Sequence, residues 1–220
     1  MGTMLCFLTT DAAVSAKALD AALRHAVDES FNMVSIDGDT STNDMCTILA
    51  NGLADGDEIS EPSGTDFETF TAALTQLCVK LARTLAKDGE GASRLLVCNV
   101  TGAKDRENAR TAAKGVISST LVKAAMFGAD ANWGRVLCAL GYCGTETDVT
   151  KVGVVFSSKA GSMKVCQKGA GIPFSEEEAK KILSEDEITI DLSLADGDAS
   201  ATAFGCDLTY DSVKINGGYR

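Results

Sequence analysis

The stretch Thr3-Met4-Leu5-Cys6-Phe7-Leu8-Thr9 opens the chain with a threonine that is followed at once by an apolar run. The residues from Leu5 to Thr9 predict a short β-strand, so the threonine stands at the beginning of a strand. A threonine hydroxyl is a poor nucleophile unless a base lies beside it, and the free amine of an N-terminal threonine supplies that base. The reference pKa of an α-amino group, about 7.7–8.0, suits a general base near neutral pH.

Thr3 can act in this way only after the Gly2–Thr3 bond is cut, because Met1 and Gly2 precede it in the sequence. Glycine before the threonine tolerates the backbone conformations that self-cleavage through an N-to-O acyl shift requires. The alternative interpretation is that Met1 and Gly2 are a start added by a cloning vector and that Thr3 is an ordinary residue at a strand edge. Judged on Thr3 alone, this second interpretation is favoured.

The composition provides enough apolar residues for a large core. The chain has 220 residues, of which 45% are hydrophobic, so it can form one large domain or two small ones. No run approaches the roughly 18 apolar residues that span a bilayer, and the first residues lack the features of a signal peptide. Twenty Lys and Arg against 31 Asp and Glu give a net charge of −11, which argues against binding of nucleic acid.

The eight cysteines mostly occur singly within apolar runs, and His25 is the single histidine. Because no CxxC pair is present, the spacing predicts no zinc site. We expect free, buried thiols in a reducing compartment. His25 also lacks the neighbouring Ser or Cys motif of a catalytic triad, and the chain has neither a GxxxxGK[ST] nor a GxGxxG phosphate loop.

Helical and strand patterns alternate along the chain. Beyond the first strand, the expected helices cover 12–29 (capped by Asp11), 44–51, 65–87, 105–125 and 175–184, and the expected strands cover 31–36, 95–100, 152–156, 163–166, 187–194 and 199–210. Several strands follow one another late in the chain, so the pattern predicts an α/β fold with α+β mixed layers. The glycine-rich stretch 88–91 predicts a boundary between a domain over 1–91, which carries Thr3, and a C-terminal α/β domain over 92–220.

Three polar stretches are candidates for chemistry. The loop 37–44 has the oxygen-bearing side chains of a calcium loop but lacks its required Gly and Glu, so calcium binding is rejected. It is either a polar turn held by its own side chains or the lining of a polar substrate pocket. Glu90, between two glycines, is either a solvated turn residue or the partner of a substrate amine. Trp133 near Arg135 is either a packing contact or the wall of a binding site.

Five stretches in register resemble one family. They read GTMLCFLTTDA (2–12), SIDGDTSTND (35–44), DGEGA (88–92), GADANWGR (128–135) and SATAFGCDLTY (200–210). Together they resemble the β chain of the ornithine acetyltransferases, many of which are bifunctional and also act as glutamate N-acetyltransferases of arginine biosynthesis. The stretches occur in the family's order and span the chain from end to end.

The resemblance implies a self-processing acyltransferase fold of the ornithine acetyltransferase and aminopeptidase type, with an N-terminal threonine and a separate α chain that completes it. The family's autocatalytic cleavage site falls between Gly2 and Thr3, and its nucleophile falls on Thr3. The resemblance thus implies that Met1 and Gly2 are the stub of the α half, either native or retained as a start. The family's substrate-binding carboxylate falls on Glu90, and its C-terminal substrate-binding asparagine on Asn216. No metal or cofactor is implied, and acetyl-CoA is a second acetyl donor only in bifunctional members.

By the same resemblance, the partner is the α chain of the same precursor in an α2β2 heterotetramer. The expected compartment is the bacterial cytoplasm or, in a eukaryote, the mitochondrial matrix. The family's α half supplies oxyanion-hole donors and a substrate-binding lysine, and each such donor is worth about 2.7–4 kcal/mol in a comparable case. Family members usually continue past the position of Arg220 with a Thr or Ser that also touches the substrate.

The resemblance implies ping-pong transfer of an acetyl group from N-acetylornithine to glutamate through an acetyl ester on Thr3. Two alternatives stay open. One is a related self-processing aminopeptidase or amidohydrolase, which releases the acyl group to water. The other is a β chain that is inert without its α half.

Overall fold

A computed structural model describes residues 3–218 of the chain. These residues divide into two compact units. The smaller unit comprises the described residues up to Asn32 together with Gly38–Ala82, and the larger unit comprises Met33–Asp37 together with the described residues from Arg83 onward. The sequence analysis placed a boundary between residues 91 and 92, whereas the contacts divide the chain inside the long helix that precedes this point.

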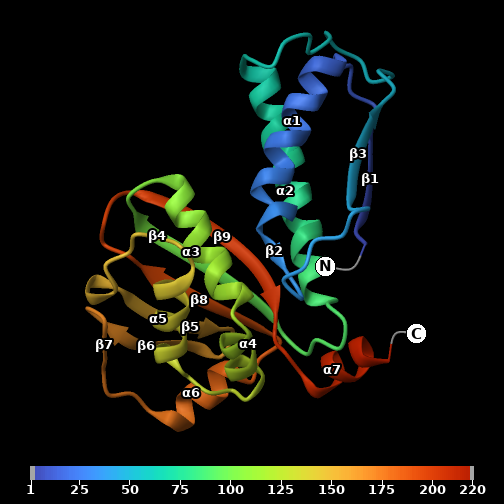
Figure 1. Ribbon diagram of the computed structural model, residues 1–220. Helices are drawn as coiled ribbons and strands as arrows, with labels where there is room; N and C mark the ends of the chain where they lie inside the picture. The colour runs from blue at the N-terminus through green and yellow to red at the C-terminus, as the bar shows by residue number, and fades with distance from the viewer. Residues whose placement is uncertain (1–2, 219–220) are drawn as a thin grey trace. The chain divides into compact units, whose positions relative to one another are not determined.

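The smaller unit pairs two strands with two helices (Figure 1). Strands β1 (Leu5–Thr10) and β3 (Met45–Ala50) form a two-stranded parallel sheet, in which Leu5 aligns with Met45. Helix α1 (Ala16–Glu29) packs against β3, and the second helix is α2 (Thr65–Lys87). Three alanines of α1 that are spaced four residues apart are fully buried, which lets the helix approach its neighbours closely.

Two expectations for the smaller unit are wrong. The predicted helix over 44–51 is strand β3, because its residues pair in register with β1 and long-range pairing overrides local helix propensity. Helix α1 begins at Ala16 rather than residue 12, because the Ser15 side chain, not Asp11, caps it by accepting the Ala18 N–H at 3.2 Å. A long loop follows β3 and leads to α2.

The larger unit is built on a seven-stranded mixed sheet with the order β2-β9-β4-β8-β5-β6-β7. Its strands are β2 (Val34–Ser35), β4 (Leu95–Ala103), β5 (Gly153–Ser158), β6 (Gly161–Gln167), β7 (Ala170–Gly171), β8 (Glu187–Ser193) and β9 (Ala199–Cys206). Strand β4 is parallel to β8 on one side and antiparallel to β9 on the other. This mixed sheet with its helices confirms the predicted α/β class with mixed layers.

One face of this sheet forms the core of the larger unit. The helices are α3 (Arg106–Ser118), α4 (Thr120–Phe127), α5 (Trp133–Tyr142), α6 (Glu176–Leu183) and α7 (Tyr210–Gly217). Phe156 and Ile190 from the sheet join Ile117 of α3 and Met126 of α4 in one fully buried cluster. Residues that alternate with the buried ones along β8 are polar, and Asn99 and Thr101 continue this polar face on the second half of β4.

The remaining sequence expectations hold with corrections. The strands expected at 95–100, 152–156, 163–166 and 187–194 and the helices expected at 65–87 and 175–184 are confirmed, with shifts at their ends. The helix expected over 105–125 is two helices, because Ser119 ends α3 and caps α4. The strand expected over 199–210 ends at Cys206, and the strand expected over 31–36 is reduced to Val34–Ser35. The sequence analysis did not predict helices α5 and α7.

Two short 3₁₀ helices, Phe31–Met33 and Val149–Lys151, complete the assigned secondary structure of residues 3–218. Within the same range, none of the helices combines the length and apolar character that a membrane crossing requires.

Candidate functional site

Thr3 lies in the smaller unit, directly before β1, and it is exposed. Its hydroxyl oxygen is 3.0 Å from the hydroxyl oxygen of Ser41. The N–H of Met4 donates to a carboxylate oxygen of Asp44 at 2.8 Å, and the N–H of Met45 donates to the Met4 carbonyl at 2.8 Å. The polar loop before β3 therefore holds the beginning of β1 and touches the predicted nucleophile.

This geometry gives the loop 37–44 a role that the sequence left undecided. The side chains of Ser41 and Asp44 contact the residues that precede β1, so the loop is more than a turn held by its own side chains. Ser41 also accepts the N–H of Asn43 at 3.2 Å, which fixes its side chain within the loop. Gly2, the other residue of the predicted cleavage junction, lies outside the described residues.

Glu90 lies in the larger unit, on an exposed turn between α2 and β4. The N–H of Ala92 donates to the Gly89 carbonyl at 2.8 Å and closes the turn. Gly91 has φ +70, as the third position of a type II turn requires. A Cβ at Gly91 would collide with the backbone of Ser212, at the beginning of α7, so only glycine allows this close approach.

The strand end that follows Glu90 is fixed by one buried carboxylate. Asp207, 1% exposed, accepts the N–H groups of Ser93 at 2.8 Å and Arg94 at 3.0 Å on one oxygen. The hydroxyl of Ser93 donates to the other oxygen, and the Arg94 guanidinium lies 3.8 Å from it. A buried carboxylate with this many donors is stabilised by charge-assisted hydrogen bonds, so it can anchor the segment that follows Glu90.

Asn216 lies in the last turn of α7 and is exposed. Its side-chain amide donates to the Ser212 carbonyl at 2.9 Å. Thr209 caps α7 in a capping box with Ser212, and the Thr209 hydroxyl donates to the Gly91 carbonyl at 2.6 Å. The same hydroxyl therefore joins the Glu90 turn to the helix that carries Asn216.

The structure thus brings together the segments of two of the three predicted site residues. Glu90 and Asn216 belong to the larger unit and are linked through Thr209, whereas Thr3 belongs to the smaller unit. Sequence reasoning missed Asp207, Thr209 and Ser41 as residues that support the site. All three nevertheless lie within stretches that carried the family resemblance, and this was the available signal.

A buried lysine lies next to this anchor. Lys123 of α4 is 6% exposed, and its ammonium donates to the Cys206 carbonyl at 2.5 Å. Burial raises the pKa of the Cys206 thiol, and the nearby Lys123 ammonium opposes that rise. The Lys123 ammonium therefore contacts the last residue of β9, and the buried carboxylate of Asp207 is carried by the next residue along the chain.

The Trp133 stretch performs packing and capping. Asn132 caps α5 by accepting the Arg135 N–H at 3.2 Å, and the Arg135 guanidinium donates to the Leu121 carbonyl at 2.9 Å. Trp133 is partly buried against the core, with its indole ring over Gly171. Of the two interpretations of this stretch, these contacts favour packing.

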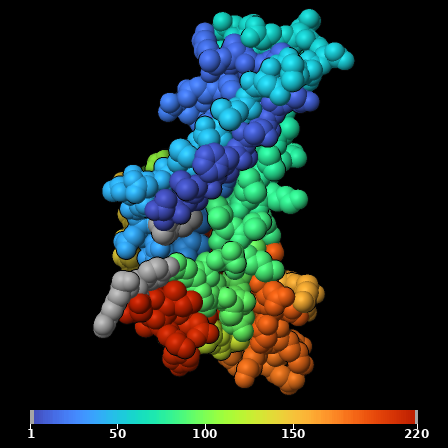
Figure 2. Space-filling model, turned by 90° about the vertical axis from the view of Figure 1, so that its right-hand side faces the viewer, coloured from blue at the N-terminus to red at the C-terminus, as the bar shows by residue number. Residues whose placement is uncertain are grey.

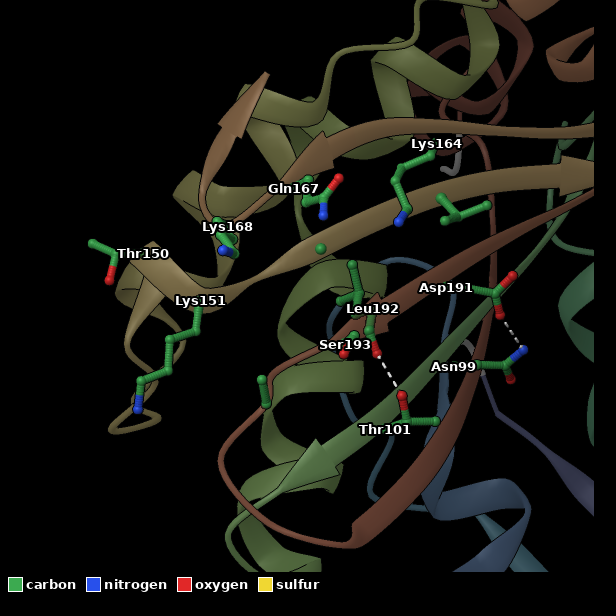
Figure 3. A pocket seen from close by; sticks show the side chains of 13 residues that line it. Asn99, Thr101, Thr150, Lys151, Lys164, Gln167, Lys168, Asp191, Leu192 and Ser193 are labelled. Atoms are coloured by element: carbon green, nitrogen blue, oxygen red, sulfur yellow. Dashed lines mark hydrogen bonds between the residues drawn. The ribbon is translucent and has the colours of Figure 1, made fainter. Parts of the chain in front are cut away.

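A pocket of about 490 Å³ lies on the polar face of the seven-stranded sheet (Figure 3). Asn99 donates to Asp191 at 2.9 Å across strands β4 and β8, and Thr202 donates to Asn99 at 2.9 Å. Lys151, Lys164 and Lys168 belong to its lining. None of the three predicted site residues lines this pocket, whose central polar groups bond to one another.

No group of three or more His, Cys, Asp or Glu side chains within residues 3–218 is arranged to hold a metal ion. All eight cysteines are free thiols, and Cys138 is the exposed one. Burial raises the pKa of the Cys98 thiol strongly, and the Asp191 carboxylate adds to this rise.

The chain is similar in sequence to one protein family and to several of its curated members. Residues 1–220 match the ArgJ family. The arginine biosynthesis bifunctional protein ArgJ 1 of Clostridium acetobutylicum is 50% identical over 220 residues, and ArgJ of Bacillus subtilis is 45% identical. Both alignments cover 100% of this chain but only 54% and 53% of the relative, so the chain spans about half the length of the curated relatives it matches.

A solved structure gives the same fold. The crystal structure of arginine biosynthesis bifunctional protein ArgJ from Bacillus halodurans superposes with a TM-score of 0.93 at 43% sequence identity. The match covers 99% of this chain and 100% of that chain. The chain therefore shares the overall fold of a crystallised polypeptide of similar extent.

Proposed function

The chain belongs to the ArgJ family, and on this premise we propose that it is the nucleophile-bearing part of an ornithine acetyltransferase of arginine biosynthesis. The observation that carries the proposal is the family match over the whole chain, which includes Thr3 at the head of β1. Because the chain spans about half of its curated relatives, we assign the complete activity to the longer protein.

The proposed reaction proceeds in two acyl transfers. The amine of a free Thr3 takes the proton from the Thr3 hydroxyl, whose oxygen attacks the acetyl carbonyl of N-acetylornithine. The tetrahedral intermediate collapses, the C–N bond breaks, and ornithine leaves with the proton. The amine of glutamate then attacks the acetyl ester, and N-acetylglutamate forms as the Thr3 hydroxyl regains its proton. The Ser41 hydroxyl, 3.0 Å from that of Thr3, orients the attacking oxygen.

Glu90 and Asn216 are proposed to bind substrate. The Glu90 carboxylate would pair with a substrate amino group, and the Asn216 amide would help to fix the substrate. Both side chains are exposed, and both are carried by segments that Thr209 joins. Such rigid support is what a binding group needs, because small displacements of positioning residues are costly in rate.

The proposed partner is the α chain of the same precursor in an α2β2 heterotetramer. This α chain would supply the oxyanion donors and a substrate-binding lysine. In support, the chain covers all of the crystallised Bacillus halodurans chain but about half of the curated relatives, as expected if the relatives are cut near the position of Thr3. Glutamate and N-acetylornithine are the proposed substrates, acetyl-CoA is the donor of a bifunctional member, and no cofactor or metal is assigned. The bacterial sources of the relatives favour the cytoplasm.

The test compares the full-length precursor with its Thr3→Ala variant. We expect the wild-type precursor to yield two chains, the second beginning at Thr3, and to convert N-acetylornithine and glutamate to ornithine and N-acetylglutamate. Thr3→Ala should neither cut nor transfer, while Thr9→Ala, at an exposed position of β1, should do both. A Thr3→Ala protein that matures and transfers acetyl groups normally would refute the proposal.

The same assay separates transfer from hydrolysis. Transfer requires the acetyl ester to be shielded from water until the acceptor amine enters, so N-acetylglutamate should exceed free acetate by a wide margin. Free acetate as the main product, unchanged when glutamate is added, would instead identify a self-processing amidohydrolase.

A further inference from the structure

The pocket on the polar face of the seven-stranded sheet is lined by none of the residues proposed for acetyl transfer. We call it the sheet pocket. Gly153 of β5, the strand between β6 and β8, belongs to its lining and pairs with Ser193 of β8. A Cβ at Gly153 would meet the Cys166 carbonyl oxygen at 3.8 Å as its nearest atom, so the protein itself leaves room for a side chain there. Glycine within a strand often marks a place where a ligand approaches the backbone closely.

Four hydrogen-bonding side chains of the sheet pocket have no hydrogen bond or ion pair within residues 3–218. They are the ammonium groups of Lys164 and Lys168, the amide of Gln167 and the hydroxyl of Ser193. Lys164 and Gln167 lie on β6, Lys168 lies in the turn that follows, and Ser193 ends β8 (Figure 3). These four donors on two strands border the space above Gly153, which carries no side chain.

The carboxylate in the lining does not neutralise this group of donors. Asp191 accepts hydrogen bonds from Asn99 at 2.9 Å and from Ser157 at 3.3 Å. Asp191 and Lys164 align with Val155 from opposite sides, so two strand spacings, about 9–10 Å, separate their backbones. The β6 side of the sheet pocket is therefore positively charged, in a chain whose net charge is −11.

The backbone beside the sheet pocket is strained at two positions. Among residues 3–218, three non-glycine residues have positive φ, and two of them, Lys168 at +51 and Ala195 at +53, line this pocket. Lys168 and Gly169 form the two-residue turn between the paired residues Gln167 and Ala170, where asparagine or glycine is the usual choice for the first position. Strained residues of this kind cluster at ligand sites, and this strain holds an ammonium group at the pocket.

We propose that the sheet pocket binds a small phosphate monoester, whose phosphate lies between Lys164 and Lys168. This inference is independent of the proposed function. Two ammonium groups match the charge of about −1.5 to −2 that a phosphate monoester carries at pH 7, and lysine is a common phosphate ligand. The Ser193 hydroxyl and the Gln167 amide add neutral donors. The volume of about 490 Å³ exceeds that of a phosphate group, and Val155 offers apolar surface to the organic part.

The experiment measures binding of phenyl phosphate to the full-length protein by isothermal titration calorimetry at constant ionic strength. This probe joins a phosphate monoester to a small apolar body. We expect saturable binding that is at least tenfold tighter than binding of benzoate, which brings a single charge, and no binding of phenol. Inorganic phosphate should bind more weakly than phenyl phosphate, because it lacks the apolar body. Equal affinity for benzoate or for inorganic phosphate would overturn the assignment of a phosphate monoester.

Three variants test the assigned groups. Lys164→Gln removes one ammonium, and Lys168→Asn removes the other while it introduces a residue that suits the left-handed turn. Each should weaken binding of phenyl phosphate about tenfold. Gly153→Val fills the space above β5 with a side chain that the strand accommodates, and it should abolish binding. Thermal denaturation of each variant verifies that it is folded.

The matched control is Lys180→Gln on α6. Lys180 is exposed, and its ammonium, like that of Lys164, has no ion pair within residues 3–218. Helix α6, orange at the bottom of Figure 2, packs through Ala179 and Leu183 on the core face of the sheet, opposite to the sheet pocket. This variant should bind phenyl phosphate with wild-type affinity.

Two further results would refute the sheet pocket as a phosphate site. One is the absence of saturable phenyl phosphate binding to the full-length protein. The other is a loss of affinity in folded Lys164→Gln and Lys168→Asn that is no larger than the loss in Lys180→Gln, since binding would then follow the overall charge of the chain and not the pocket.

Discussion

The buried carboxylate of Asp207 accepts both the backbone N–H and the hydroxyl of Ser93, a residue 114 positions earlier in the chain. This contact fixes the segment between the Glu90 turn and β4, because the adjacent Arg94 N–H donates to the same carboxylate. Asp207 is followed two residues later by Thr209, which bonds to the Gly91 carbonyl. The end of β9 therefore holds the Glu90 turn at two points.

Asp207→Ala should destabilise the chain by about 3 kcal/mol, because it leaves buried donors and the Arg94 guanidinium without their acceptor. Asp207→Asn keeps the size and one acceptor oxygen but removes the charge. We expect the Asp207→Asn variant to fold. Its KM for N-acetylornithine should rise about fivefold with little change in kcat, because Asp207 positions the segment that carries a substrate-binding group. Urea denaturation and steady-state kinetics of the matured protein measure the two effects.

The control for Asp207 is Asp211→Asn, an exposed residue in the first turn of α7. It should leave both the stability and KM close to wild type. If Asp207→Asn instead lowered kcat and kept KM, the carboxylate would act on the reaction and not on the position of Glu90.

Gly91→Ala should lower both stability and substrate affinity. The residue has φ +70, which costs a non-glycine residue about 1–2 kcal/mol, and its Cβ would press on the backbone of Ser212. Because the turn must then move away from α7, KM should rise as well. Gly141→Ala is the matched control: this helical glycine has open space around its Cβ position, and alanine should stabilise by about 0.5–1 kcal/mol. Thermal denaturation of both variants decides the comparison, and equal shifts would refute the packing argument.

Ser41→Ala should slow acetylation of Thr3 about fivefold, which corresponds to one hydrogen bond of about 1 kcal/mol. The loss arises because the Thr3 hydroxyl is no longer held for attack. Thr42→Ala, at the exposed neighbouring position, should leave the rate unchanged. Single-turnover mixing with N-acetylornithine in the absence of glutamate measures this step, and a wild-type rate for Ser41→Ala would show that Ser41 supports only the fold.

The sequence predicted the elements whose patterns are local. Helix α2 and strand β8 were predicted within a few residues because the apolar spacing of each identifies its buried face. Helix α7 was missed because its apolar residues Tyr210, Val213 and Ile215 are exposed, so no apolar stripe marks it. Strand β3 was mistaken for a helix because its conformation depends on pairing with β1, about forty residues earlier.

The candidate site divides in a similar way. Thr3, Glu90 and Asn216 stay predictions that the family resemblance placed on this sequence residue by residue. Their supports were not found, since Asp207 meets Ser93 over 114 positions and Ser41 meets Thr3 over 38. The sequence does not distinguish a buried Asp from an exposed one, and only the fold shows which carboxylate accepts several hydrogen bonds.

The stability of the smaller unit should fall as the pH rises above about 9. Burial, together with the neighbouring Cys6, raises the pKa of Cys46 to about 12 and that of Cys78 to about 11, while both thiols titrate near 9 when unfolded. Between these values the unfolded chain binds fewer protons than the folded chain, so the free energy of unfolding decreases with pH. The contribution of the two protonated thiols to stability is fully present below pH 9 and is lost towards pH 11–12.

The urea midpoint of unfolding, measured between pH 7.5 and 10.5 under reducing conditions, should decline with pH. Cys46→Ala should reduce that decline, whereas Cys138→Ala, at an exposed position, should not. A pH dependence that is identical in all three proteins would show that the smaller unit does not hold Cys46 protonated.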